Sequence, residues 1–307
     1  MLSWFSLPPS YGWTGYYDNI GDMTNTGVEI DLSGTIIQTR NVAWSANFNI
    51  TYYKNKLAYL APERKTTTVD GVNGYMSGNF FYGEGIPLYS YYMYKYAYPD
   101  PDTGDALYWH RTINEAGKEE LVAVPYQGLD TGGTNDYFIV GSTLPKAYGG
   151  FGTSVEFFGF DFSIDFTYSC GGKILDSMYQ MFMSSPISTS IGNNFHQDLI
   201  NAWTPENRNT NIPILKYNDQ YAGMTSDRFL TDASYLNLQT INFGYTFPRK
   251  WMEKLQIENL RVYFAADNIY YWSKRKGLDP RQSITGGGNA TYYSPIRTLT
   301  GGLSVTF

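Results

Sequence analysis

The stretch VAWSANFNITYY, residues Val42 to Tyr53, alternates strictly between two sets of side chains. A period of two is the pattern of a β-strand whose two faces meet different surroundings. Soluble strands average about 5 to 6 residues, whereas a tilted membrane-spanning strand needs about 9 to 11. This stretch sustains its alternation over its whole length and therefore predicts a strand that crosses a membrane. One face carries Val42, Trp44, Ala46, Phe48, Ile50 and Tyr52.

The same alternation recurs along the chain, in residues 27–37, 151–157, 160–168 and 260–272. Gly159 separates two of these segments and predicts a tight hairpin. In residues 234–247 the apolar parity changes, which predicts a β-bulge near Thr240. The last nine residues, LTGGLSVTF, alternate again and end on Phe307. An apolar face that ends on an aromatic residue is typical of the closing strand of an outer-membrane barrel.

Short and long connections alternate between the expected strands. The short ones are residues 38–41, the turn at Gly159 and residues 248–258; the long ones are 54–85, 111–136, 171–231 and 273–295. Membrane barrels with up-and-down strands keep short turns on the periplasmic side and long loops outside. With weaker strands at 86–97 and 105–111, we expect an all-β fold: about nine strands of an antiparallel transmembrane β-barrel. An odd count that starts outside cannot close as an ordinary single-chain barrel.

Composition agrees with this fold class and excludes others. The 307 residues are 18% aromatic and only 16% charged, and Tyr and Trp suit membrane interfaces. A net charge of -6 argues against nucleic acid as a partner. Cys170 is the only cysteine, so no intrachain disulfide can form. No apolar run approaches the roughly 18 residues of a membrane helix, and residues 1–10 do not resemble a secretory signal.

Seven segments in order resemble the C-terminal part of the SusC/RagA family of TonB-dependent outer-membrane transporters. They are GVEIDLS, GIPLYSYYMYKYAYPDPDTGDALYW, LPKAYGGFGTSVEFFGFDFSIDFTYSCGGKILD, AWTPENRNTNIPIL, SDRFLTDASYLNLQTINFGYTFP, LRVYFAADNIYYWSKRKGLDPR and the terminal GGLSVTF. The resemblance covers the chain from about Gly27. It implies a 22-stranded barrel with an N-terminal plug, which works with a SusD-like surface lipoprotein to import large nutrients, glycans or peptides, in Bacteroidetes.

The resemblance also implies a division of the chain and its partners. Residues 1–26 would end a preceding extracellular loop or strand, and 27–307 would be the C-terminal barrel portion, with the plug domain absent. Coupling to the TonB complex would need that missing N-terminal part, so we expect the chain to be unable to transport alone. Leu303, Val305 and Phe307 would be the signal for the barrel-assembly machinery, and outer-membrane lipid would surround the strands.

The long connection 171–231 is the expected place of recognition. It carries Tyr179, Trp203, Tyr217 and Tyr221 among Asn and Asp residues. Aromatic faces stack on sugars and also anchor protein interfaces. Three uses remain open for these residues: packing within the loop, contact with a lipoprotein lid, or contact with substrate.

Candidates for chemistry are few. Asp100, Asp102 and Asp105 lack the distant Glu of a calcium loop, and a polar turn is favoured. Carboxylates on the polar face of a strand, such as Asp161 and Asp165, need no catalytic explanation in a polar lumen. We therefore expect no enzyme, no metal site and no cofactor. The alternative function is a soluble or secreted all-β glycan-binding module, which would bury one face of shorter strands.

Overall fold

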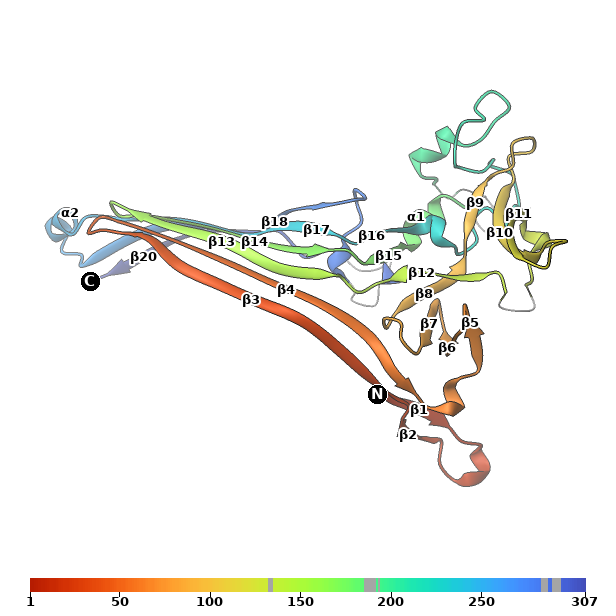
Figure 1. Ribbon diagram of the computed structural model, residues 1–307. Coiled ribbons are helices and arrows are strands. Elements are labelled where there is room, and N and C mark those ends of the chain that lie inside the picture. Colours follow the sequence, from red (N-terminus) through yellow and green to blue (C-terminus); the bar gives the residue numbers. More distant parts are fainter. Residues whose placement is uncertain (132–134, 185–191, 193, 283–286, 289–293) are drawn as a thin grey trace.

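The computed structural model describes residues 1–307 except 132–134, 185–191, 193, 283–286 and 289–293. Parts of three expected loops therefore lie outside the described residues. The main feature is a sheet of seven antiparallel strands, called here the long sheet, in the order β20-β18-β17-β14-β13-β4-β3 (Figure 1). Its strands are β3 (Gly21–Gln38), β4 (Val42–Leu60), β13 (Ala147–Phe157), β14 (Phe160–Cys170), β17 (Tyr235–Thr246), β18 (Asn259–Ser273) and β20 (Thr298–Thr306).

The strand register confirms that the alternation divides the sheet into two faces. One row across the sheet is apolar: it runs through Leu32, Phe48, Phe151, Phe166, Leu238 and Tyr270. The adjacent row on the other face is polar or small: it runs through Ser33, Asn47, Gly152, Asp165, Thr240 and Asp267. We call these the apolar face and the polar face. The rings of Phe151 and Phe166 stack at 4.9 Å, so neighbouring strands support each other on the apolar face.

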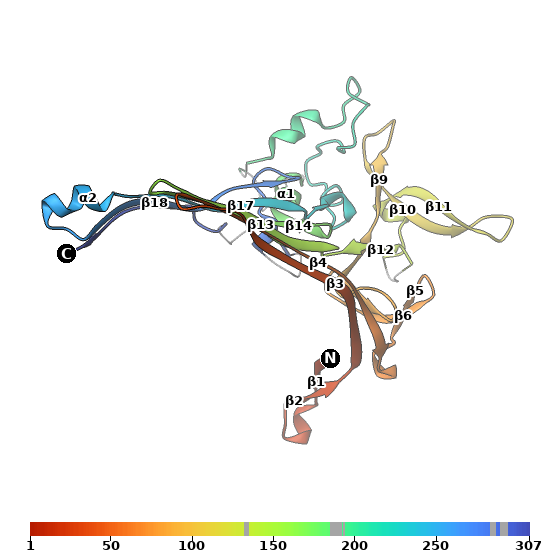
Figure 2. The ribbon, with the colours of Figure 1, turned by 60° about the vertical axis from the view of Figure 1, so that its left-hand side comes forward.

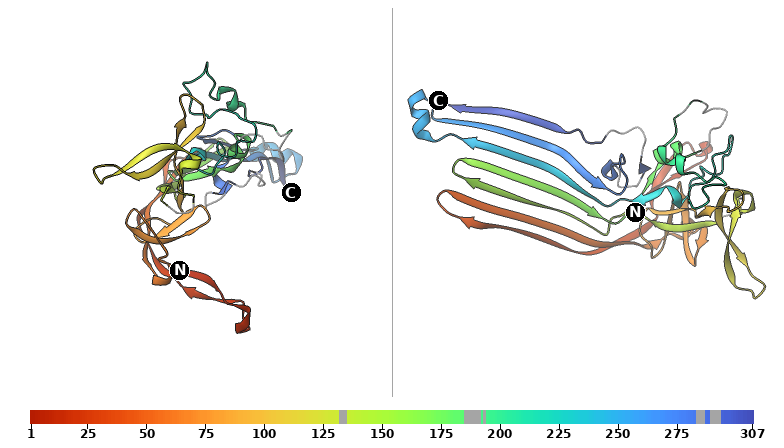
Figure 3. Two further views of the ribbon diagram at one scale, coloured as in Figure 1. Left: turned by 90° about the vertical axis from the view of Figure 1, so that its right-hand side faces the viewer. Right: turned by 90° about the horizontal axis from the view of Figure 1, so that it is seen from above.

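All short turns lie at one end of the long sheet and all long connections at the other (Figure 3). The hairpin at Gly159 is a two-residue turn in which Phe158 and Gly159 have φ of 47° and 88°. Two left-handed residues give the type I′ turn, whose twist matches that of paired strands. The bulge expected near Thr240 is confirmed, because the pairing with β14 passes from Thr240 to Leu238 and skips Gln239.

Two of the nine expected strands do not belong to the long sheet. The weaker segments 86–97 and 105–111 do form β8 (Ser90–Tyr94), β9 (Tyr96–Pro99) and β10 (Ala106–Ile113), but these pair in smaller sheets. The reason is burial: every residue of β8 is buried, so it has no face for lipid. The long sheet thus has seven strands, and the count remains odd because the two weaker segments lie within one connection.

At the loop end of the long sheet, two strands extend further than the alternation predicts. β4 continues to Leu60, through part of the expected loop 54–85, and β3 begins at Gly21, before the expected boundary at residue 27. The two strands pair with each other from Gly21 and Leu60 onward. Apart from Met23, residues 22–26 are polar on both faces, so alternation could not reveal this part of the strand.

The loop region at the end opposite the turns has its own small sheets (Figure 2) and its own buried clusters. Tyr137 packs against three buried clusters, which are centred on Phe229, Tyr108 and Phe81. The remaining strands are β1 (Leu2–Ser6), β2 (Gly15–Asn19), β5 (Thr67–Val69), β6 (Val72–Ser77), β7 (Phe80–Gly83), β11 (Glu119–Pro125), β12 (Tyr137–Ser142), β15 (Lys173–Asp176), β16 (Leu230–Asp232) and β19 (Gly287–Gly288). The α-helices are α1 (Ser177–Phe182) and α2 (Arg249–Met252), beside 3-10 turns at Pro9–Tyr11, Pro62–Arg64, Tyr126–Gly128, Gln197–Asn201, Asp227–Phe229, Glu253–Leu255 and Pro280–Gln282.

Within the described residues, none of the helices has the length and apolar character needed to cross a membrane.

Candidate functional site

The polar face of the long sheet carries hydrogen-bonded side chains rather than a catalytic pair. Arg261 Nη2 on β18 donates to Asp161 Oδ2 on β14 at 2.6 Å, across the intervening β17. Gly244 on β17 makes this reach possible, because a Cβ there would lie 2.5 Å from Asp161 Oδ1. The Asp161 carboxylate is thereby neutralised by a cation, an arrangement that suits a polar lining and not a free acid or base.

The loop region is held together by buried tyrosines. Tyr94 and Tyr137 lie with ring centroids 4.4 Å apart, and the Tyr108 hydroxyl donates to the carbonyl of Tyr221 at 2.5 Å. Burial raises the pKa of Tyr94 and of Tyr108, so both stay neutral donors across the physiological range. The tyrosines of β8 and Tyr108 of β10 therefore build the loop core, whereas Tyr98 of β9 is exposed.

A partly buried cation, Arg228, lies beside the same core. The Arg228 guanidinium lies 5.3 Å from the ring centre of Tyr96 and 5.1 Å from that of Phe229, and it donates to the carbonyl of Ala222 at 2.9 Å. Burial lowers the pKa of Arg228, and burial raises the pKa of neighbouring Asp227, which accepts a hydrogen bond from the Tyr96 amide. These contacts tie the connection after β14 to β9.

The four aromatic residues expected to serve recognition lie in different surroundings. Tyr179 on α1 packs beside Phe229, donates to Asp198 Oδ2 at 2.8 Å, and lies under Arg275 at 3.6 Å. Trp203 is only 3% exposed. Its indole fills the space above Gly104, where a Cβ would lie 2.4 Å from the ring.

The other two aromatic residues reach the surface. Tyr221 stacks on Tyr126 with ring centres 4.7 Å apart and is partly exposed, whereas Tyr217 is 65% exposed. The structure does not bring the four aromatic residues together as one site. Their recognition roles therefore remain predictions.

The two histidines have acidic neighbours, but these contacts are structural. His110 Nδ1 lies 2.9 Å from Asp136 Oδ2, and this buried carboxylate also accepts the amides of Arg111 and Asp130. Burial alone would raise the pKa of Asp136, yet the hydrogen bonds from His110 and the two amides outweigh it and lower that pKa. No group of three or more His, Cys, Asp or Glu suited to a metal occurs among the described residues.

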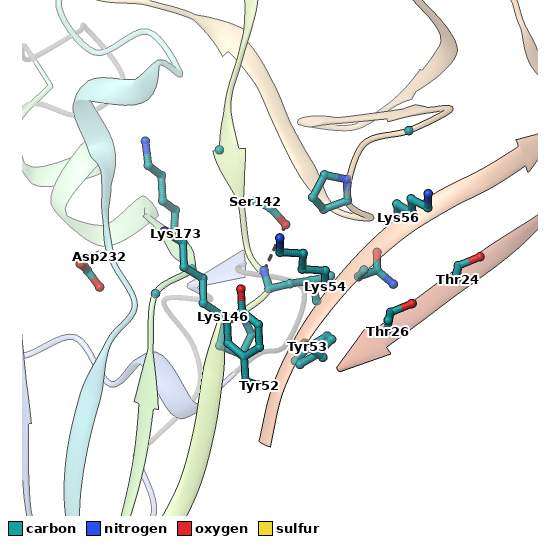
Figure 4. Close-up of a pocket in the computed structure, with 18 of the residues that line it drawn as sticks. Thr24, Thr26, Tyr52, Tyr53, Lys54, Lys56, Ser142, Lys146, Lys173 and Asp232 are labelled. Atoms are coloured by element: carbon teal, nitrogen blue, oxygen red, sulfur yellow. Dashed lines mark hydrogen bonds between the residues drawn. The ribbon is translucent and has the colours of Figure 1, made fainter. Parts of the chain in front are cut away.

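One cavity of the structure was missed by the sequence reasoning. It has a volume of about 940 Å³ and lies where the ends of β3 and β4 farthest from the short turns meet β12, β15 and β16 (Figure 4). Four lysines line it: Lys54, Lys56, Lys146 and Lys173. The sequence did contain an indication of this cavity. Lys54 and Lys56 lie on the same side of β4 as Ile50 and Tyr52, so they continue the apolar series beyond Tyr52 with two charged residues.

Comparison with known proteins identifies relatives of this chain. The chain is 26% identical to TonB-dependent receptor P3 of Formosa agariphila over 319 residues, which cover 98% of this chain and 30% of that protein. It is 26% identical to TonB-dependent receptor SusC of Bacteroides thetaiotaomicron, over 94% of this chain and 27% of that protein. The chain is homologous to TonB-dependent receptors of the SusC/RagA type. Such receptors are outer-membrane proteins, and the outer membrane is the location of this chain.

Solved structures of the RagA transporter have the same fold. The structure of the RagAB peptide transporter superposes with a TM-score of 0.78 at 24% identity, over 98% of this chain and 31% of that chain. The RagAB peptide importer in its open-open state gives 0.76 at 25% identity, over 100% of this chain and 31% of that chain. No model of a known protein family matches the sequence.

These comparisons confirm the resemblance and the fold class expected from the sequence. The chain spans about 30% of the length of the curated relatives it matches. Those relatives are receptors and transporters rather than enzymes.

Proposed function

We propose that this chain is the C-terminal barrel portion of a TonB-dependent outer-membrane transporter that imports large nutrients, glycans or peptides. In this proposal a SusD-like surface lipoprotein covers the loop region, and the TonB complex acts through a part of the protein outside this chain. The chain alone does not transport. Leu303, Val305 and Phe307 present the closing strand to the barrel-assembly machinery.

The observation that carries the proposal is the architecture of the long sheet. Its strands expose large apolar side chains such as Phe48, Phe151 and Phe243 along one whole face. A soluble module would bury such a face, because extended apolar patches of this kind associate in water. Lipid is the surrounding that makes this face stable. Loops at one end and short turns at the other give the sheet the polarity of an outer-membrane barrel.

We propose two different roles for the four aromatic residues of the connection between β14 and β17. Trp203 and Tyr179 hold the connection between β14 and β17 in place, and the exposed rings of Tyr217 and Tyr221 contact the lipoprotein lid or the substrate. Tyr217→Ala in the complete transporter should then weaken lid association or uptake while the amount of inserted protein stays unchanged. Unchanged uptake and lid association would show that Tyr217 serves neither contact.

The topology is tested by labelling cysteines in intact cells. Cys170 is exposed and is first replaced by Ser. We expect Lys118→Cys, in the exposed turn between β10 and β11, to react with an impermeant maleimide in intact cells. Lys254→Cys, in the turn between β17 and β18, should react only after the outer membrane is permeabilised. Equal labelling of both sites in intact cells would contradict the proposed orientation.

The transport role is tested by deleting the gene. The deletion strain should lose growth on a subset of glycans or of peptides as sole nutrient, and the complete gene should restore that growth. Growth of the deletion strain on every glycan and peptide source tried, at the rate of the parent strain, would contradict the import role.

A further inference from the structure

The cavity of about 940 Å³ lies at a place where the long sheet divides. β13 pairs with β4 as far as Ala147 opposite Tyr52, whereas β3 stays paired with β4 to Leu60. Beyond Tyr52 the other edge of β4 makes backbone hydrogen bonds at two places, from Tyr53 to Lys146 and between Leu57 and residues 85 and 86. The two halves of the wall separate beyond Tyr52, and the cavity occupies the opening between them. Figure 4 shows Thr24, Thr26 and Lys56 on one side of the cavity, and Lys173 and Asp232 on the other.

The β3 and β4 residues that line the cavity come from both faces: Thr24, Thr26, Tyr52, Lys54 and Lys56 have the parity of the apolar face, whereas Tyr53 and Asn55 have that of the polar face. The register between β3 and β4 is continuous from Met23 opposite Leu57 to Thr35 opposite Ser45. Lys54 and Lys56 therefore have the same parity as Ile50 and Tyr52, which belong to the apolar series. A second cavity, of about 670 Å³, is also lined by residues of both faces, among them Asn49 and Tyr148 of the polar face and Gly149 and Tyr168 of the apolar face. Lys146 lines only the first of these two cavities.

Three of the four lysines that line the cavity have no acidic partner among the described residues. Lys54, Lys56 and Lys146 are exposed, and none forms an ion pair within 4.0 Å with another residue of the described ranges. Lys173 differs, because its amine donates to the carbonyl of Val140. The acid that lines the cavity is Asp232, whose carboxylate already accepts the amide of Ser234 at 2.7 Å. The cavity thus has an excess of positive charge in a chain with a net charge of -6.

The lysines also lie at a defined height. From Val42 to Tyr52 the apolar series of β4 takes ten steps of about 3.4 Å, which at a tilt of about 40° give a height of about 26 Å. This equals the apolar band of about 25 Å in outer-membrane barrels. Lys54 lies two residues beyond Tyr52, about 5 Å above that band by the same geometry, at the level of lipid head groups.

We propose that Lys54, Lys56 and Lys146 bind the phosphorylated head group of a lipid in the outer leaflet. The inference rests on the proposed function, because it requires the apolar face to meet the membrane. An anionic group in this place would gain from three lysines that form no ion pair among the described residues. A lipid is favoured over a soluble anion because Lys54 and Lys56 continue the apolar series of β4, along which acyl chains lie.

The test uses the complete transporter purified in detergent, with monophosphoryl lipid A as the probe and native mass spectrometry as the readout. Each of Lys54→Gln, Lys56→Gln and Lys146→Gln should weaken lipid binding about fivefold, and the triple variant on the order of 100-fold. Lys118→Gln removes the same charge from an exposed loop residue and serves as the matched control. It should bind the lipid as the parent protein does.

Two further arms identify the ligand. Lipid A without its phosphate should bind the parent protein as weakly as the phosphorylated lipid binds the triple variant. Millimolar inorganic phosphate should not displace the phosphorylated lipid. Displacement by free phosphate would overturn the lipid assignment, and equal binding by the parent and the three single variants would overturn the site.

Failure of this inference can be told apart from failure of the proposed function. The single variants are first checked for insertion by heat-modifiable migration and for cysteine labelling at residues 118 and 254. Normal insertion with unchanged lipid binding would contradict the lysine site alone. A parent protein that does not insert would contradict the transporter proposal.

Discussion

A lysine on the apolar face should destabilise the barrel far more than a lysine on the polar face at the same height. Phe48 lies on the apolar face of β4, six residues after Val42, and the same strand geometry places it about 16 Å above the start of the apolar series. The midpoint of a 25 Å band lies at about 13 Å, so Phe48 lies near the middle of the membrane. The neighbouring Asn47 has nearly the same height but belongs to the polar face, opposite Gly152.

A lysine at the membrane midplane costs about 2 to 4 kcal/mol on the lipid side of a barrel. Phe48→Lys should therefore lower the ratio of folded to unfolded protein by about 30-fold to 1000-fold. Asn47→Lys should change it by less than about threefold, because its side chain meets water and lies near the Asp165 carboxylate. The assay is urea unfolding of the complete transporter in lipid vesicles, followed by tryptophan fluorescence, with Phe48→Leu as a control for lost ring packing. Equal losses for the two lysine variants, or a larger loss for Asn47→Lys, would refute the assignment of the faces.

Three more outcomes follow from single residues. Phe158→Asn should stabilise the hairpin by about 1 kcal/mol, because Asn tolerates the left-handed conformation better than Phe; Gly159→Ala should destabilise it, since a Cβ would lie 2.6 Å from the carbonyl of Thr246. Urea unfolding measures both. The Asp136 carboxylate has a lowered pKa, so its stabilising contribution is complete above its ordinary pKa of 3.8 and disappears as the pH falls below that value. Hydrogen exchange of the two amides bound to Asp136 should show this loss in the parent and not in Asp136→Asn. Trp203→Ala should cost about 3 to 5 kcal/mol in loop stability, and Tyr217→Ala less than about 0.5 kcal/mol, when proteolysis of the loop is measured.

The part of the fold inside the membrane could be predicted from sequence, because lipid and water impose different side chains on the two faces of a strand. Val42–Tyr53 and Phe160–Tyr168 therefore carried enough information to give strand, face and turn. The bulge at Gln239 was detectable for the same reason, since the shift in pairing appears as a change of parity.

In the loop region, above the membrane, alternation no longer identified the strands. In β8, Tyr91 and Tyr92 point to opposite faces, yet both are buried, so no alternation marks the strand as part of a small sheet. In β3, residues 22–26 are exposed on both faces and look like a loop. The burial of Trp203 was not predictable either, because it depends on Gly104, about a hundred residues earlier in the chain.

The lysine cavity lies where the apolar series of β4 ends and the loop region begins. The parity of β4 persists through Lys54 and Lys56 because β3 still pairs with it there, but the residues of that parity change from apolar to basic. A strand that merely left the membrane would need no fixed charge on the side that had faced lipid. Two lysines at successive positions of that parity, joined by Lys146 across the division of the sheet, place positive charge where lipid head groups begin. The transition from aromatic to basic residues on one strand face is therefore the sequence feature from which this kind of site can be sought in related chains.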